Sequence, residues 1–180
     1  MNRNRKEGAD MATSTGPQLA QSIDQSIEDL KKACARVDEH IASSAPEGRW
    51  SPKEILSHLL GPEGSGMLPT LQAFLNQENP RIDIEPENPF YTGERVRMTF
   101  AQLLAEVEQE YGRMSKFASD LSGEQLDRKA HIPLLKGTPF GEYPTLEKWI
   151  GLLGGSEESH VQFHIKDMRE TLQSLGVPKK

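Results

Sequence analysis

The sequence predicts an all-α protein, a four-helix bundle with a long connection between its second and third helices. Wherever the apolar residues recur regularly, they do so at steps of three and four, and no segment has a convincing strand pattern. A chain of 180 residues is also long enough for one domain with a sizeable core. Residues 17–180 are therefore expected to form a single bundle domain, preceded by a disordered tail over residues 1–16.

Three of the helices have long inward stripes of apolar residues. The first is expected over residues 17–43, the third between Phe100 and Leu121, and the fourth over residues 145–175. The fourth stripe contains two histidines and is made up of Leu146, Trp149, Leu153, His160, His164, Met168 and Leu172. A short extra turn is expected at residues 122–127, after the third helix.

The second helix has a clear start and an interruption. Ser51 is a plausible N-cap, a proline follows at the first helical position, and Glu54 lies three residues after the cap. The Gly-Pro pair at residues 61–62 is expected to kink the helix, because a proline removes a backbone hydrogen bond. The helix should then resume through Leu71, Phe74 and Leu75. Residues 76–97 hold three prolines without a steady period and are predicted to be the long connection.

Charge and composition bear on partners and location. The formal net charge of −6 argues against nucleic acid as a partner, because a phosphate backbone requires a basic face. No apolar run approaches the roughly 20 residues of a membrane span, and no secretory signal precedes the first helix. The single cysteine, Cys34, lies on a core stripe and fits a buried apolar role in a reducing cytosol. We therefore expect a cytoplasmic protein that contacts neither membrane nor nucleic acid.

His160 and His164 are the most informative pair in the sequence. Residues four apart lie on one face of a helix, close enough to share a metal ion. Five histidines would produce such a pair by chance about once in ten sequences of this kind, so the spacing alone is a moderate signal. Val161 stands where the zincin motif has glutamate, which excludes the His-Glu-x-x-His pattern.

His58, on or beside the buried face of the second helix, is the third candidate ligand. Three neutral imidazoles leave a tetrahedral metal one open position for water or substrate, as in catalytic zinc sites. Zinc is the first choice for such a ligand set and nickel the second. The alternative is a metal-free core in which the imidazoles are hydrogen-bonded. His40 is expected to be solvated, and His131 is expected to be a surface loop residue.

Two carboxylates lie near the candidate ligands in the sequence. Glu157 precedes His160 by three residues, and Glu63 follows His58 by five. Either could hydrogen-bond a ligating imidazole or act as a catalytic base on bound water. The alternative for each is an ordinary solvated glutamate.

The segments "RWSPKEILSHLL" and "HVQFHIKDMRETL", together with the Pro-rich crossover and the loop "GTPFGEYPTLEKWI", resemble the DinB/YfiT-like superfamily of metalloenzymes. The resemblance implies a four-helix bundle in which His58, His160 and His164 bind zinc or nickel. It also implies a homodimer and, from thiol transferases within the superfamily, a low-molecular-weight thiol such as bacillithiol or mycothiol. Two features depart from the family pattern. The break at residues 61–62 follows His58 closely, and Asp167 stands where glutamine is common.

The sequence thus predicts a metal-dependent enzyme that acts on a small-molecule substrate. The metal would activate water or a thiol, and the reaction would be hydrolysis or thiol transfer. A non-catalytic metal-binding stress or binding protein is the alternative from another class. A pocket that opens onto the metal would favour the enzyme, and a closed site with four protein ligands would favour the structural role.

Overall fold

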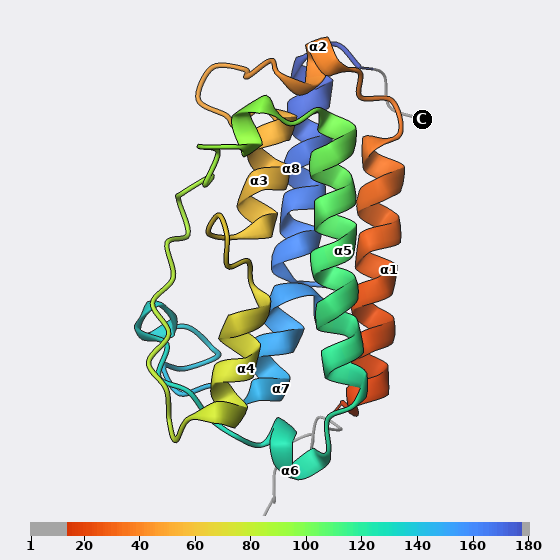
Figure 1. The fold of residues 1–180 in the computed structure, drawn as a ribbon. Helices are drawn as coiled ribbons and strands as arrows, with labels where there is room; N and C mark the ends of the chain where they lie inside the picture. Colours follow the sequence, from red (N-terminus) through yellow and green to blue (C-terminus); the bar gives the residue numbers. More distant parts are fainter. Residues whose placement is uncertain (1–13, 178–180) are drawn as a thin grey trace, which may run out of the picture.

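The computed structural model describes residues 14–177, which form four helical columns (Figure 1). Two columns are single helices, α1 (Gly16–Cys34) and α5 (Phe100–Ser119). The second column stacks α3 (Pro52–Leu60) on α4 (Leu68–Asn76). The fourth column consists of α7 (Leu146–Ile150), a π-helical segment (Gly151–Gly155) and α8 (His160–Ser174). The described residues contain isolated bridges but no strand, which confirms the predicted all-α bundle.

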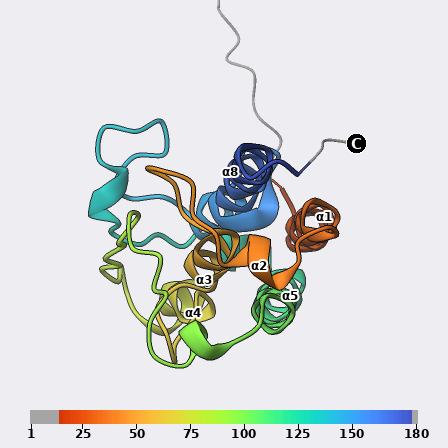
Figure 2. The same ribbon diagram turned by 90° about the horizontal axis from the view of Figure 1, so that it is seen from above.

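The columns follow one another up, down, down and up (Figure 1). This order requires a crossover, and residues 77–99 run back along the length of the bundle between α4 and α5. The predicted long connection over residues 76–97 is confirmed to within two residues. Seen from above, α1 lies beside α5 and α8, and α3 also contacts both of these helices (Figure 2). The short helices are α2 (Glu39–Ala42), η1 (Arg95–Arg97), α6 (Gly123–Leu126), as predicted for residues 122–127, and η2 (Pro133–Leu135).

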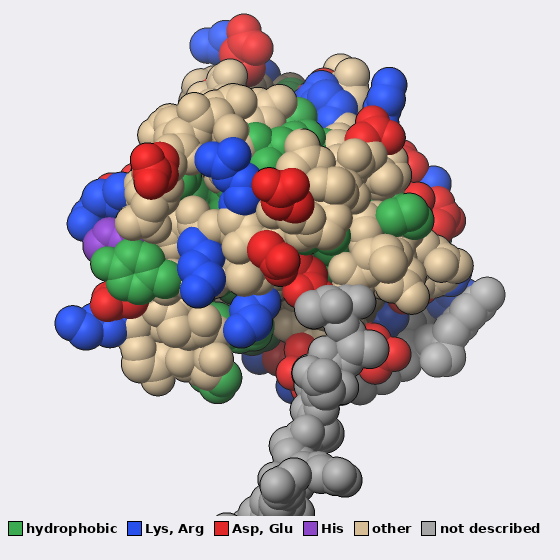
Figure 3. All heavy atoms as spheres, turned by 90° about the horizontal axis from the view of Figure 1, so that it is seen from below, with side chains coloured by type: hydrophobic (Ala, Val, Ile, Leu, Met, Phe, Trp, Pro, Cys, Tyr) green, Lys and Arg blue, Asp and Glu red, His purple; other side chains and the backbone are tan. Residues whose placement is uncertain are grey.

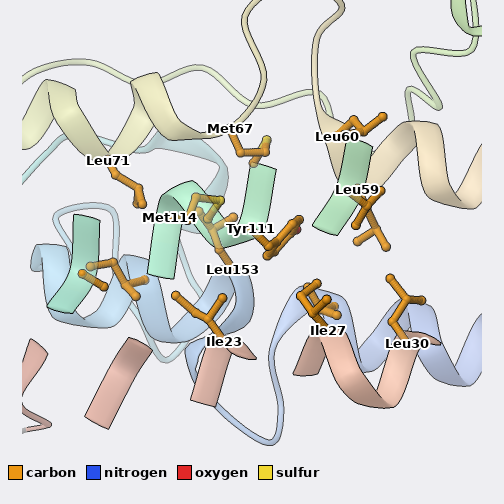
Figure 4. Packing of buried hydrophobic residues seen from close by; sticks show 14 of the residues in the cluster. Ile23, Ile27, Leu30, Leu59, Leu60, Met67, Leu71, Tyr111, Met114 and Leu153 are labelled. Atoms are coloured by element: carbon orange, nitrogen blue, oxygen red, sulfur yellow. The ribbon is translucent and has the colours of Figure 1, made fainter. Parts of the chain in front are cut away.

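The core lies where the inward stripes of the columns meet (Figure 4). Fully buried side chains come from every column and include Ile23, Leu30, Leu56, Leu71, Tyr111, Met114 and Leu146. Gly154 allows the π-helical segment to approach α5 closely, because a Cβ there would lie 3.2 Å from the ring of Tyr111. The burial of these apolar side chains supplies the main driving force for folding.

The predicted first helix over residues 17–43 is too long. Helix α1 ends at Cys34, and the side chain of Asp38 accepts a hydrogen bond from the backbone N–H of Ile41 to begin α2. An aspartate that caps a new helix competes with helix continuation, and periodicity alone does not detect this.

The predicted continuous fourth helix over residues 145–175 is also wrong. Ser156 leaves the helical conformation, and Ser159 starts α8 by accepting a hydrogen bond from the backbone N–H of Gln162. The π-helical segment before this break contains three glycines, which lower helix stability. As a result, His160 is the first residue of α8 rather than a mid-helix residue.

A side chain of α5 stabilises the break between α3 and α4 in the second column. The N-cap of α4 is Met67, whose side chain makes no capping hydrogen bond. The buried carboxylate of Glu110 accepts hydrogen bonds from the backbone N–H groups of Met67 and Leu68 at 2.7 and 2.8 Å. Gly66, with a φ of +71°, brings the chain against this carboxylate, and a Cβ there would lie 2.5 Å from it. A glutamate from another helix therefore replaces the missing cap.

Most of the predicted tail, residues 1–16, lies outside the described residues, so its disorder stays a prediction. Thr15 caps α1, which begins at Gly16. Within residues 14–177, no helix combines the length and apolarity that crossing a bilayer would require. At the end of the bundle shown in Figure 3, acidic and basic side chains are interspersed on the visible face.

Candidate metal centre

Three histidines far apart in the sequence meet inside the bundle. His58 comes from α3, and His160 and His164 come from α8, which packs against it. One ring nitrogen of each lies within 4.8 Å of the corresponding nitrogens of the other two. The Nε2 atom of His160 is central, at 2.8 Å from Nε2 of His58 and 3.1 Å from Nε2 of His164. The structure therefore brings together the three residues that were predicted as metal ligands.

Local structure orients His58. The capping box of Ser51 and Glu54 fixes the start of α3, as the sequence predicted. At the other end, the buried guanidinium of Arg95 donates hydrogen bonds to the carbonyls of Ser57 and Gly61. These carbonyls flank His58 and would otherwise be unsatisfied at the end of a helix. Arg95 thus stabilises the turn that carries the imidazole.

The crossover segment fixes the tautomer of His58. Its Nδ1 lies 2.7 Å from the carbonyl oxygen of Asn88, which can only accept a hydrogen bond. Nδ1 must therefore carry the hydrogen, and Nε2 of the neutral ring presents a lone pair toward His160. Such a backbone contact is the usual way in which a ligating imidazole is oriented.

Aromatic side chains enclose the cluster. Trp50 stacks on the ring of His164 at 6.0 Å between centroids, and Phe90 stacks on His58 at 6.2 Å. Phe163 meets His164 edge-on at 5.0 Å. Phe90 has a positive φ of 49°, unusual for a residue other than glycine, and its carbonyl accepts a hydrogen bond from Ser57. These rings shield the imidazoles from bulk water on the sides that they cover.

Burial keeps the three imidazoles neutral at neutral pH. It lowers the pKa of His58, and it lowers the pKa of His160 to about 4, with a further contribution from His58. Burial and the two neighbouring histidines also lower the pKa of His164 well below its usual value. Neutral imidazoles can offer lone pairs to a cation without first losing a proton.

The hydrogen bonding of the cluster fits a cation better than a metal-free core. The Nε2 atom of His160 touches two other Nε2 atoms, but a single N–H on it can point at only one of them. The Nδ1 atoms of His160 and His164 are buried without a hydrogen-bond partner among the described atoms, and this holds whether or not their Nε2 atoms bind a cation. A tetrahedral cation would accept all three Nε2 lone pairs with the nitrogens about 3.3 Å apart, close to the observed contacts. The donor set therefore suits a divalent metal.

Without metal, the protein is expected to lose stability as the pH falls from about 6.5 toward 4. The unfolded imidazole of His160 titrates near 6.5, whereas the folded one has a pKa of about 4. Between these values the unfolded chain binds more protons, so acid favours unfolding by up to about 1.4 kcal/mol per pH unit for each such histidine. Urea unfolding of chelator-treated protein at pH 7, 6 and 5 measures this slope. The slope should be shallower for His160→Gln, and an unchanged slope would contradict the assignment.

The two carboxylates predicted from sequence spacing make no hydrogen bond to the imidazoles among the described residues. Glu157 is exposed in the turn before α8. Glu63 accepts hydrogen bonds from the backbone N–H of Glu94 and the hydroxyl of Thr92. Neither is among the residues that line the pocket beside the histidines, so the geometry does not favour the predicted catalytic role. Asp167 is nearer, with Oδ2 3.7 Å from Nδ1 of His164, while its Oδ1 accepts a hydrogen bond from Arg49.

A pocket of about 390 Å³ opens beside the cluster. His58 and His160 line it, whereas His164 lies behind them against Trp50. The crossover segment, the start of α4, η2, the π-helical segment and α8 supply the other walls. Glu158, which has no distinguishing spacing in the sequence, also lines the pocket. His40 is exposed, and His131 lies in a loop outside the cluster, as predicted.

The groups that support the metal ligands leave little signal in the sequence. Arg95 and the Asn88 carbonyl come from the crossover segment, where no periodicity exists to reveal an inward-facing residue. Trp50 belongs to a segment that carries the family resemblance and stands immediately before the capping box of α3, but nothing in the sequence placed its ring against His164.

The chain is similar to one protein family in sequence and to a solved structure in fold. The sequence profile of the DinB superfamily matches residues 22–163, which include His58 and His160 and end one residue before His164. Among solved structures, the chain resembles YfiT from Bacillus subtilis, described as a probable metal-dependent hydrolase with an unusual four-helix bundle topology. The TM-score is 0.71 at 19% identity, over 98% of this chain and 95% of that one. No curated protein matches the sequence.

Proposed function

We propose that this chain, which belongs to the DinB superfamily, is a metal-dependent enzyme that acts on a small molecule by hydrolysis or thiol transfer. The observation that carries the proposal is that His58 and His160 stand both in the three-imidazole cluster and in the wall of a pocket. Structural metal sites are closed by four protein ligands, whereas catalytic sites keep one coordination position open to a cavity. The similarity to YfiT supports the fold, and the description of that protein agrees with the proposal.

His58, His160 and His164 would hold the metal, with zinc the first choice and nickel the second. When bound, a divalent cation supplies Lewis acidity, which lowers the pKa of a water molecule or a thiol to near neutrality. The chain itself contributes orientation and exclusion of water. Asn88 holds the tautomer of His58, and Trp50 and Phe90 cover the imidazoles.

The pocket also gives a place for the second reactant. Its volume of about 390 Å³ falls within the range of small-molecule sites. A substrate seated there would lie beside the imidazoles of His58 and His160, whereas Trp50 packs on the cluster without lining the pocket. The non-catalytic alternative is weaker because a metal that only stabilises the bundle needs no adjoining cavity.

The first test is whether turnover depends on metal. Protein purified without a nickel column is analysed for bound metal and assayed with 4-nitrophenyl acetate and with 1-chloro-2,4-dinitrobenzene plus a thiol. We expect one of the two activities, its loss after chelation and its return with added zinc or nickel. His164→Ala should lack that activity, while the exposed His40→Ala should keep it.

The two substrates separate the two reactions. Turnover of the ester alone would identify a hydrolase, and turnover of the halogenated ring only with thiol would identify a transferase. Activity that is indifferent to chelation, or metal binding without any turnover of a wider substrate panel, would contradict the proposed enzyme.

A further inference from the structure

The pocket beside the histidines is mainly apolar. Side chains of four separate segments form its wall: Met67 before α4, Ile84 in the crossover segment, Leu135 in η2, and Leu152 and Leu153 in the π-helical segment. Such a wall favours a ligand with an apolar body, because the ligand gains free energy by leaving water.

Apolar side chains at the pocket also reach the molecular surface. Leu134 from η2 is 45% exposed, and Phe163 from α8 is 65% exposed. Large apolar side chains left in water around a cavity are typical of a ligand-binding site. They extend the apolar wall outward from the histidines.

The charged side chains that line the pocket are all acidic. Asp83, Glu85 and Glu158 line it, and none of the lining residues among the described part of the chain is Lys or Arg. Asp83 is paired with Arg81, which lies outside the lining. The carboxylate of Glu85 accepts a hydrogen bond from the neutral side-chain amide of Asn88, and no lysine or arginine of residues 14–177 forms an ion pair with Glu85. In the metal-free protein, Glu85 and Glu158 therefore give the pocket wall a net negative charge.

We infer that the ligand of this pocket has an apolar body and a cationic or neutral polar group, and that anionic groups placed beside Glu85 and Glu158, away from the metal, are disfavoured. The inference rests on the proposed function, since it names the class of substrate for that site. It also bears on the thiol: a low-molecular-weight thiol that carries carboxylates would be repelled by Glu85 and Glu158, whereas a neutral or amine-bearing one would not.

The test uses three probes that share a naphthalene ring and differ in charge. They are trimethyl(naphthalen-2-ylmethyl)ammonium, naphthalen-2-ylmethanol and naphthalene-2-sulfonate. Calorimetric titration into the full-length, chelator-treated protein isolates the preference of the pocket from direct ligation to a metal. We expect the cation to bind about tenfold more tightly than the anion at low salt, with the alcohol between them, because each exposed carboxylate contributes a few-fold. Added salt should narrow the difference.

Matched variants locate the effect. The double variant Glu85→Gln/Glu158→Gln should lose most of the difference between cation and anion and keep its affinity for the alcohol. Glu87→Gln is the control, because Glu87 is exposed in the same segment but does not line the pocket. Leu152→Trp should weaken all three probes by filling the cavity. Circular dichroism confirms that each variant is folded.

Equal binding of the three probes, tightest binding of the anion, or no binding of any probe would overturn the inference. Unchanged binding to Leu152→Trp would also overturn it, since the probes would then sit elsewhere. A protein that ranks the probes as expected but takes up no metal would contradict the proposed function alone. Metal-dependent turnover together with a preference for the anionic probe would contradict this inference alone.

Discussion

Replacing His160 with alanine is expected to remove most of the affinity for zinc and the stability that zinc gives to the fold. His160 is the central member of the cluster, since its Nε2 contacts Nε2 of both His58 and His164. A ligand that binds only the folded state stabilises it by about 2.7 kcal/mol at a concentration of 100 times its Kd. Zinc titration against a competing chromophoric chelator measures the affinity, and urea unfolding with and without zinc measures the stabilisation.

His131→Ala is the matched control, because His131 is a partly exposed loop histidine outside the cluster. It should bind zinc as the unaltered protein does. Chelator-treated His160→Ala should also remain folded at neutral pH, so that a loss of zinc binding cannot be attributed to unfolding. Zinc binding by His160→Ala at the original affinity would show that the three imidazoles do not form the site.

Replacing Glu110 with alanine is expected to destabilise the protein by about 3 kcal/mol, even without metal. The Glu110 side chain is only 3% exposed and accepts the backbone N–H groups of Met67 and Leu68 as well as the guanidinium of Arg113. Alanine would leave two donors at the start of α4 without a partner and would remove a charged cap from the helix N-terminus. Urea unfolding at pH 7 measures the loss.

Glu106→Ala is the control for this prediction. Glu106 lies one turn earlier on α5 and is exposed, so its removal should change the free energy of unfolding by less than about 0.5 kcal/mol. Because Met67 also lines the pocket, Glu110→Ala should weaken binding of naphthalen-2-ylmethanol as well. Equal stability of the Glu110→Ala and Glu106→Ala proteins would show that the cap contributes nothing.

The sequence by itself identified the parts of the site that lie on regular helices. His160 and His164 share a face because of the helical repeat, and the capping box at Ser51 and Glu54 sets the start of the helix that carries His58. These features depend on neighbours within one turn, so spacing reveals them. Glu157 would share the face of His160 only in an unbroken helix, and the break at Ser156 removes that relation. Glu63 is near His58 only in sequence, because the chain between them is not helical after residue 60.

Groups contributed by distant segments could not be predicted in this way. Arg95 and the carbonyl of Asn88 reach His58 from the crossover segment, and Glu110 caps α4 from another helix. Each contact joins residues at least 30 positions apart and leaves no periodic trace in the sequence.

The sequence therefore determined the helical class through its periodicity, the long connection through prolines without a period, and the histidine pair of the fourth helix through its spacing. The place of His58 on the second helix, together with the family resemblance, added it to that pair. Only the tertiary structure decided that the fourth helix breaks before His160, that the histidines meet, and that a pocket with acidic residues lies beside them. The physical reason is that helix ends and cavities depend on packing between segments, where contacts such as that of Gly154 with Tyr111 override local preference.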